Sequence, residues 1–154
     1  MSDDINRLAD WAAPLLAGLS AERRRAAMVQ VATYLRRSQA ERIAAQRNPD
    51  GSPYEPRKPR LRNKKGAIRR TMFEKLRQAK RLRKTATDNS ATVTIGGRSA
   101  RIARVHQYGL RDKVDWRKAR TVTVKYAQRQ LLGFTAADED AITDIVLHHI
   151  TAGG

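Results

Sequence analysis

The chain of 154 residues has no cysteine, which excludes disulfide bonds and thiolate chemistry. Aromatic residues make up only 5% of it, and no apolar run approaches the length that spans a membrane. The first residues, MSDDINRLADW, place acids where a secretory signal peptide needs basic residues. We therefore expect a soluble, cytoplasmic protein of one domain, residues 1–154, with a modest core and no membrane partner.

Acidic residues are scarce where basic residues are dense. Between Arg57 and Lys84 the sequence has fourteen Lys or Arg residues and one acid, Glu74. Such a concentration is typical of a surface for a polyanion, most often nucleic acid, because neutralised phosphates release counterions. The alternative is a solvated arm without a specific partner. The residues expected to face nucleic acid are Arg57, Lys58, Arg60, Arg62, Lys64, Lys65, Arg69, Arg70, Lys80, Arg81, Arg83 and Lys84.

This basic run lacks any element that reads bases. Phe73 is its only aromatic residue, and the sequence has no zinc-finger spacing and no helix-turn-helix pair. Contact with DNA is therefore predicted to be nonspecific and sensitive to salt. Residues 57–66 are expected to be mobile, whereas the apolar spacing over 67–82 favours a basic amphipathic helix.

Catalytic motifs are also missing. The adjacent His148 and His149 would point about 100° apart on a helix, so they cannot share a metal as an i, i+4 pair does. The acids between Asp138 and Asp144 fit the first turns of a helix, where the helix dipole favours negative charge. His106 is interpreted as a structural histidine. We expect no enzyme activity, no metal and no cofactor.

The N-terminal third has clear helical periodicity. A first helix is expected behind Ser2 or Asp3 as its N-cap, with apolar residues at helical spacing from Ile5 onward. Pro14 is expected to kink or interrupt it, and Gly18 to end it. Ser20 is the predicted N-cap of a second helix that runs to residue 46. A short turn between two such helices predicts an antiparallel helical hairpin.

The remaining two thirds alternate between loops and short elements. Residues 48–56 contain three prolines and a glycine, which excludes regular structure there. Alternation over 91–95 predicts a strand that enters a turn at Gly96-Gly97, and 121–126 predicts another strand. Residues 99–105 fit either a returning strand or a short helix.

A last helix is expected to begin after Thr135, with Asp138 and Glu139 in its first turn and Ile142 and Val146 on its buried face. The predicted fold is α+β, with an N-terminal helical hairpin, a small antiparallel sheet and a C-terminal helix. Residues 48–84 form a basic, proline-containing extension within it.

Three short stretches, in this order, carry a resemblance to a known family: 46–51 with Tyr54 and Pro56, 103–109, and 129–134 before the acidic helix. Together they resemble the tail completion (virion morphogenesis) family of contractile-tailed bacteriophages. The sequence departs from it at 126–129, where relatives tend to have a proline, and at Tyr54, where tryptophan is common. The motif residues are Pro49, Asp50, Gly51, Tyr54, His106, Gln107, Tyr108, Gly109, Leu131, Leu132 and Gly133.

The resemblance implies a structural role in the virion, at the head-proximal end of the tail, after assembly in the host cytoplasm. Distant similarity to neck and tail-terminator proteins implies a homo-oligomeric ring, expected to be a hexamer, that contacts tail tube or sheath and neck or connector proteins. Two other hypotheses stay open: a monomeric nonspecific nucleic-acid-binding protein, and a nuclease of unrecognised type.

The stretch from His106 to Gly109 is predicted to serve folding and assembly. Gly109 follows an apolar-periodic segment, where a chain reversal with positive φ is expected. Tyr108 has an apolar ring with a polar tip, which suits a subunit boundary or a half-buried core edge.

Overall fold

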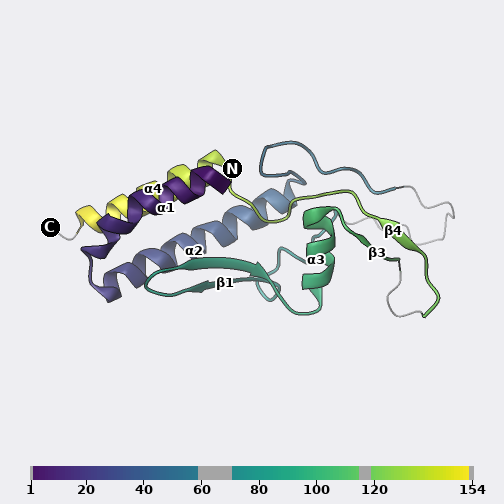
Figure 1. The fold of residues 1–154 in the computed structure, drawn as a ribbon, viewed down its shortest axis with the longest axis horizontal. Helices are drawn as coiled ribbons and strands as arrows, with labels where there is room; N and C mark the ends of the chain where they lie inside the picture. The colour runs from purple at the N-terminus through teal and green to yellow at the C-terminus, as the bar shows by residue number, and fades with distance from the viewer. Residues whose placement is uncertain (1, 59–70, 115–118, 153–154) are drawn as a thin grey trace.

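The computed structural model describes residues 2–58, 71–114 and 119–152, and Figure 1 shows their arrangement. The described elements are α1 (Ser2–Ala17), α2 (Ala21–Ala44), β1 (Leu82–Ala86), β2 (Ala91–Ile95), α3 (Ser99–Tyr108), β3 (Arg111–Lys113), β4 (Thr123–Lys125) and α4 (Ala136–Thr151). β1 pairs with β2 and β3 with β4, both antiparallel. The predicted α+β class is confirmed.

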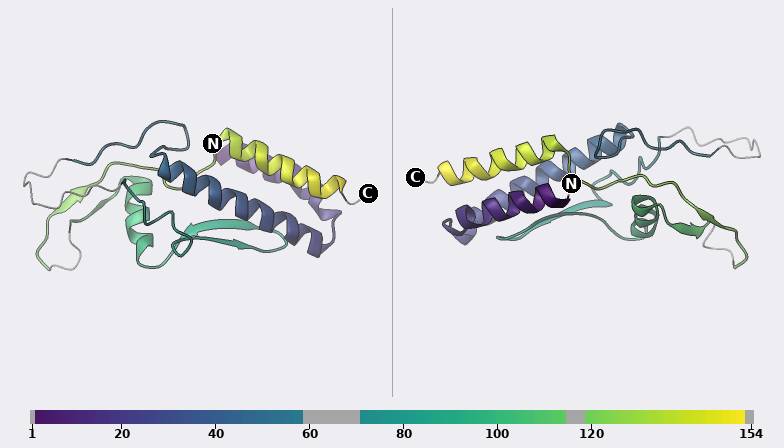
Figure 2. Two further views of the ribbon diagram at one scale, coloured as in Figure 1. Left: turned by 180° about the vertical axis from the view of Figure 1, so that it is seen from behind. Right: turned by 45° about the horizontal axis from the view of Figure 1, so that its top comes forward.

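The molecule is elongated, with α1 and α4 at one end and the β3–β4 hairpin at the other (Figures 1 and 2). α2 lies between them, and the β1–β2 hairpin packs along it. α3 stands across the molecule near the end of α2, between the two sheets. Two apolar clusters form the core, one among the helices and one around α3 and the β1–β2 hairpin.

Both N-terminal helices are confirmed. The Ser20 hydroxyl accepts a hydrogen bond from the Arg23 amide at 3.3 Å, which makes it the predicted N-cap of α2. α1 continues through Pro14 to Ala17, so this proline does not end the helix. α1 packs mainly against α4, which in turn packs against α2.

The start of α4 is fixed by a capping box. The Thr135 hydroxyl accepts from the Asp138 amide at 3.1 Å, and the Asp138 carboxylate accepts from the Thr135 amide at 2.9 Å. Asp138 is fully buried, and the Ser38 hydroxyl of α2 also donates to it. Farther along α4, Ile142 and Val146 are buried as predicted, each stabilising the fold by about 1.5–3 kcal/mol.

The prediction of a helix over 67–82 is wrong for residues 71–82, which the structure describes. Residues 71–81 form successive turns, and Leu82 begins strand β1; residues 67–70 lie outside the described residues. Phe73 has a φ of 63°, a left-handed conformation that an α-helix does not accommodate. Leu82 is fully buried opposite Ile95, so the same apolar residues that suggested a helix serve a turn and a strand.

The strand predicted over 91–95 is confirmed as β2, and its partner β1 precedes it in the chain. The turn after Gly97, whose φ is 65°, leads into α3, so residues 99–105 take the helical alternative. The strand predicted over 121–126 is confirmed in part as β4. Its partner β3 has three residues, too few to show a period.

Candidate functional site

The three motif stretches converge on the C-terminal part of α2. We call this cluster, residues 46–56, 103–109 and 129–134, the motif junction. Its centre is Gln107 on α3, whose Oε1 accepts from the amides of Leu131 at 2.8 Å and Leu132 at 2.9 Å. The Gln107 Nε2 donates to the Leu132 carbonyl at 2.8 Å. One side chain thus satisfies three main-chain groups of a segment without regular structure.

The loop after α2 holds the same segment from the other side. Asn48 accepts from the Gln130 amide at 2.9 Å, and the Tyr54 hydroxyl donates to the Gln130 carbonyl at 3.2 Å. Tyr54 is buried, and this burial raises the pKa of its hydroxyl. The loop keeps its shape through Asp50, which accepts from the Ser52 amide at 2.9 Å and from its hydroxyl, contacts that lower the pKa of Asp50.

Two motif glycines are explained by close packing. A Cβ at Gly133 would lie 2.4 Å from Cγ of Pro49, so only glycine fits beside this proline. Gly109 ends α3 with a φ of 63°, which confirms the predicted chain reversal. A Cβ there would also lie 3.2 Å from the amide nitrogen of Gln128.

Two polar residues of α2 complete the junction. Arg42 is 9% exposed and donates to the carbonyls of Gln130 at 2.9 Å and Leu131 at 3.0 Å. Gln39 accepts from the Gly133 amide at 3.1 Å and from the Arg42 guanidinium. Burial lowers the pKa of Arg42. Sequence analysis did not single out either residue; the available signal was Gln39, a polar residue at the helical spacing of the apolar Leu35 and Ile43.

His106 lies in a row of rings. Its imidazole packs edge-on between Phe73 at 4.8 Å and Tyr126 at 5.2 Å between ring centroids. Because a guanidinium can only donate, His106 Nδ1 accepts from Arg129 Nη1 at 3.1 Å. Burial and the Arg129 charge lower the pKa of His106 to about 4, so the ring is neutral near pH 7 and unsuited to acid–base chemistry there.

Arg129 connects the ring row to the loop. It is 5% exposed and donates to the carbonyls of Glu55 at 2.7 Å and Pro56 at 3.0 Å, while its own amide donates to the His106 carbonyl at 2.7 Å. Tyr108, in contrast, is 64% exposed and stands outside this network. This exposure contradicts the half-buried core edge predicted for Tyr108, and the alternative of a subunit boundary stays a prediction.

A groove opens beside the ring row, and we call it the basic groove. Its volume is about 940 Å³, and it lies between residues 55–58 and the β3–β4 hairpin. Phe73, Val114 and Tyr126 contribute apolar surface to it, while Lys58 and Lys125 are exposed at its edges. The exposed Glu55 also lines it, so the groove combines apolar walls with charges of both signs.

The predicted nucleic-acid-facing residues that the structure describes differ in their exposure and contacts. Arg57, Lys58, Lys80 and Arg83 are exposed. Arg81 is half-buried and donates to the Ser99 hydroxyl. Lys84 is exposed and donates to the Thr33 hydroxyl of α2. The other predicted residues, Arg60, Arg62, Lys64, Lys65, Arg69 and Arg70, lie outside the described residues, as does most of the segment 57–66 that was expected to be mobile.

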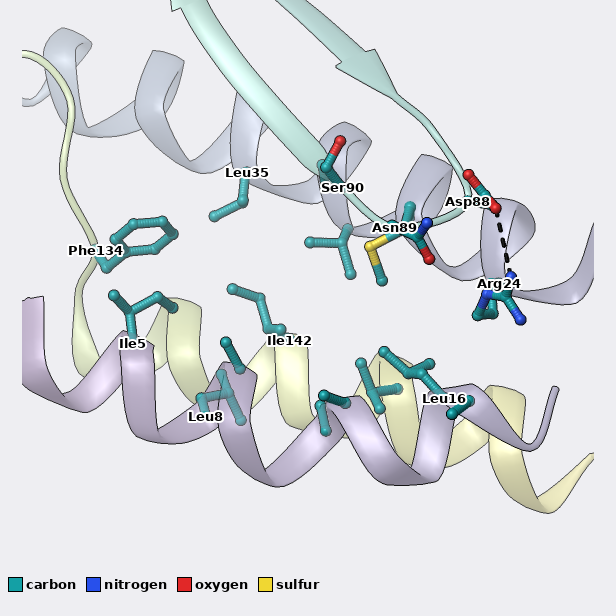
Figure 3. Close-up of a pocket in the computed structure, with 18 residues that line it drawn as sticks. Ile5, Leu8, Leu16, Arg24, Leu35, Asp88, Asn89, Ser90, Phe134 and Ile142 are labelled. Atoms are coloured by element: carbon teal, nitrogen blue, oxygen red, sulfur yellow. Dashed lines mark hydrogen bonds and ion pairs between the residues drawn. The ribbon is translucent and has the colours of Figure 1, made fainter. Parts of the chain in front are cut away.

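A second cavity, of about 720 Å³, lies between the helices and the tip of the β1–β2 hairpin (Figure 3). Ile5 and Leu8 of α1 face it from one side, and Leu35 of α2 from the other. An ion pair of 3.4 Å between Arg24 and Asp88 lies at its rim. The cavity is mostly apolar and has no titratable pair suited to catalysis.

Among the described residues, no three His, Asp or Glu side chains are grouped so that they could hold a metal ion. Within those residues, no helix has the length and apolar character needed to cross a membrane.

The model of one protein family, the phage virion morphogenesis family, matches residues 3–151. The chain belongs to this family. It is also 38% identical over 152 residues to the tail completion protein S of Escherichia phage P2, covering 96% of this chain and 98% of that relative. No solved structure matches it. The resemblance seen in the three motif stretches is thereby confirmed over nearly the whole length.

Proposed function

We propose that this protein is a structural, non-enzymatic component of a phage tail that completes its head-proximal end so that the tail can join a filled head. The observation that carries this proposal is the similarity to a tail completion protein along nearly the whole of both chains. The motif junction supports it, because the motif side chains Gln107 and Tyr54 form hydrogen bonds to main-chain groups, as residues with a structural role do.

The proposed working form is a homo-oligomeric ring, a hexamer, around the DNA path, built from one domain per copy. It would contact tail tube or sheath proteins on one side and neck or connector proteins on the other, in the finished virion. Copies in a ring multiply modest contacts through effective concentration. Exposed cations such as Lys58, Lys80 and Arg83 support a nonspecific, electrostatic contact with DNA.

A second candidate is a monomeric nonspecific nucleic-acid-binding protein. The excess of Lys and Arg over acidic residues between Arg57 and Lys84 favours this candidate. The two candidates differ in assembly: the tail protein binds one end of a tail, whereas the accessory protein binds DNA as a monomer and leaves tails unaltered.

The test uses tails from a phage mutant that lacks this protein. Purified protein is added, and electron microscopy scores protein density at one tail end and the fraction of tails joined to filled heads. Added density at the head-proximal end and restored joining are expected. Binding to DNA alone, with bare tail ends and no joining, would contradict the tail role and favour the second candidate.

A further inference from the structure

A second basic region lies outside the run from Arg57 to Lys84. Between Arg98 and Lys125 the sequence has nine Lys or Arg residues and two acids, Asp112 and Asp115. The described part of this region includes the β3–β4 hairpin, which lies at the end of the molecule opposite α1 and α4 (Figures 1 and 2). Those two helices contain seven acids and one base. The hairpin is therefore well separated from the part of the molecule that would repel a polyanion.

One face of the hairpin has three cations and a hydroxyl group. Arg111 pairs with Lys125, and Lys113 pairs with Thr123. Because cross-strand partners share a face and alternate residues of a strand point to opposite faces, these four side chains lie together. All four residues are exposed. Among the described residues, none of the three cationic side chains forms a hydrogen bond or an ion pair, so all three are available to a ligand.

Two of these cations lie directly opposite each other. The neighbouring pairs of residues form the ladder hydrogen bonds, such as the one from the Tyr126 amide to the Leu110 carbonyl at 3.0 Å. Arg111 and Lys125 are thus a pair without ladder hydrogen bonds, in which the Cβ atoms lie about 4.5–5.5 Å apart. Like charges at such a pair destabilise a hairpin, and an anion bound between them offsets the repulsion.

The acids near the hairpin do not belong to this face. Asp112 points to the opposite face, where Arg101 Nε donates to its carboxylate at 3.0 Å and the Arg101 Nη2 donates to the other oxygen. Glu55 is exposed and lines the basic groove together with Lys125, but no ion pair joins these two described residues. Among the described residues, the face of Arg111, Lys113, Thr123 and Lys125 therefore has no acid of its own.

The composition of this face favours nucleic acid over protein as its partner. Arg, Lys and Thr are side chains that contact phosphate oxygens in protein–DNA complexes. A protein interface, in contrast, needs apolar or aromatic residues at its core, where lysine is depleted. No aromatic residue and no Val, Leu, Ile or Met is among the four residues of this face.

We propose that the β3–β4 hairpin binds the phosphate backbone of double-stranded DNA through Arg111, Lys113 and Lys125. This inference rests on the DNA contact proposed above and assigns to it a surface outside the run from Arg57 to Lys84. The three cations neutralise phosphates, and the Thr123 hydroxyl donates a hydrogen bond to a phosphate oxygen. Because no base edge is contacted, the binding is independent of sequence and depends on salt.

The triple variant Arg111→Gln, Lys113→Gln, Lys125→Gln tests this site in the full-length protein. Fluorescence anisotropy of a labelled DNA duplex of about 30 base pairs, in about 50–200 mM salt, measures the affinity. Loss of three phosphate contacts is expected to weaken binding at about 0.1 M salt by at least about 10-fold and to reduce the slope of log affinity against log salt by about 2–3. Thermal unfolding should show no loss of stability, because the substitutions remove repulsion between like charges.

A matched control removes the same charge elsewhere. Arg23→Gln, Arg25→Gln and Arg36→Gln together neutralise three cations of α2 and are expected to change the affinity for DNA by less than the hairpin variant does. An equal loss of affinity in the control would overturn the inference, since net charge alone would then explain the binding.

The remaining outcomes separate this inference from the DNA contact proposed above. Unchanged affinity in the hairpin variant, with affinity lost when Lys58, Lys80 and Arg83 are replaced by Gln, would overturn the inference and leave that contact intact. A hairpin variant that binds DNA as the wild type does but cannot complement a phage defective in this protein would also overturn it, because the face would then bind an acidic protein. A wild-type protein without affinity for DNA would overturn both.

Discussion

Two regions of the molecule, the helices around α4 and the motif junction, are held together by different kinds of contact. Around α4 the contacts are apolar, with Val31, Leu35, Ile142 and Val146 buried in one cluster next to a cavity. At the junction, polar side chains such as Gln107 bind main-chain groups of a segment without regular structure. Apolar packing tolerates substitution by similar volumes, whereas a hydrogen-bonded junction depends on particular atoms. The apolar cluster around α4 is therefore expected to tolerate substitution better than the motif junction does.

Replacing Gln107 is expected to break the junction most severely. Gln107→Ala removes three hydrogen bonds and leaves the amides of Leu131 and Leu132 without this acceptor, a loss of about 3 kcal/mol in the free energy of unfolding. Urea unfolding measures it. Gln128→Ala, which removes one exposed hydrogen bond of 3.2 Å, is the control and should cost less than about 1 kcal/mol. Equal costs for the two variants would show that the junction has no special dependence on Gln107.

Gly133 tests close packing in the same region. Gly133→Ala is expected to destabilise the protein by about 2 kcal/mol, because the new methyl group would lie 2.4 Å from a proline ring that cannot rotate away. The matched change Gly18→Ala introduces a methyl group 3.6 Å from its nearest neighbour and should be nearly neutral. Thermal unfolding of both variants checks the prediction, and a neutral Gly133→Ala would contradict the tight contact with Pro49.

Substitutions in the apolar cluster around α4 are expected to destabilise the protein less. Val146→Ala removes two methyl groups from a site beside an existing cavity, so a loss of about 1–2 kcal/mol is expected, at the lower end for core truncations. Val146→Ile, which adds one methylene that the cavity can accept, should be close to neutral in the same unfolding assay. A loss from Val146→Ile larger than that from Gly133→Ala would show that the cluster around α4 tolerates substitution less well than the motif junction.

The smallest expected effect is a pH dependence at His106. Its pKa of about 4 lies below the ordinary value of 6.5, so the unfolded chain takes up a proton between these pH values and the folded chain does not. The contribution of neutral His106 to stability is therefore complete above pH 6.5 and is lost progressively as the pH falls toward 4. His106→Gln, which keeps an acceptor for Arg129, should remove this part of the pH dependence. Urea unfolding of both proteins at several pH values measures the difference, and parallel curves would contradict the low pKa.

Helices α2 and α4 were predictable because each has a long apolar period and a capping residue. Ser20 and Thr135 accept hydrogen bonds at the starts of α2 and α4 as their sequences indicate. The β1 strand was missed because Met72, Leu76 and Ala79, just before it, follow the spacing of one face of a helix. What prevents that helix is the left-handed backbone at Phe73, which no local pattern reveals.

The candidate site could be located in part. The three motif stretches were recognised as a set, and Gly109 was assigned its positive φ from the sequence. Their convergence depends on contacts between residues far apart in the chain, such as Arg42 with Leu131, and no spacing encodes these. The groove beside His106 arises in the same way, from residues 55–58 and the β3–β4 hairpin.

The central claim is that the motif residues serve folding and assembly of a tail protein. The most direct measurement is the infectious titre when a phage defective in this protein is complemented with variants of it. His106→Gln is expected to restore a titre close to that of the wild type, whereas Gly109→Val, which forces a branched side chain into a left-handed turn against Gln128, is expected to fail through loss of folding or oligomerisation. A His106→Gln protein that is folded and oligomeric but cannot restore the titre would contradict the claim and indicate a chemical role for His106.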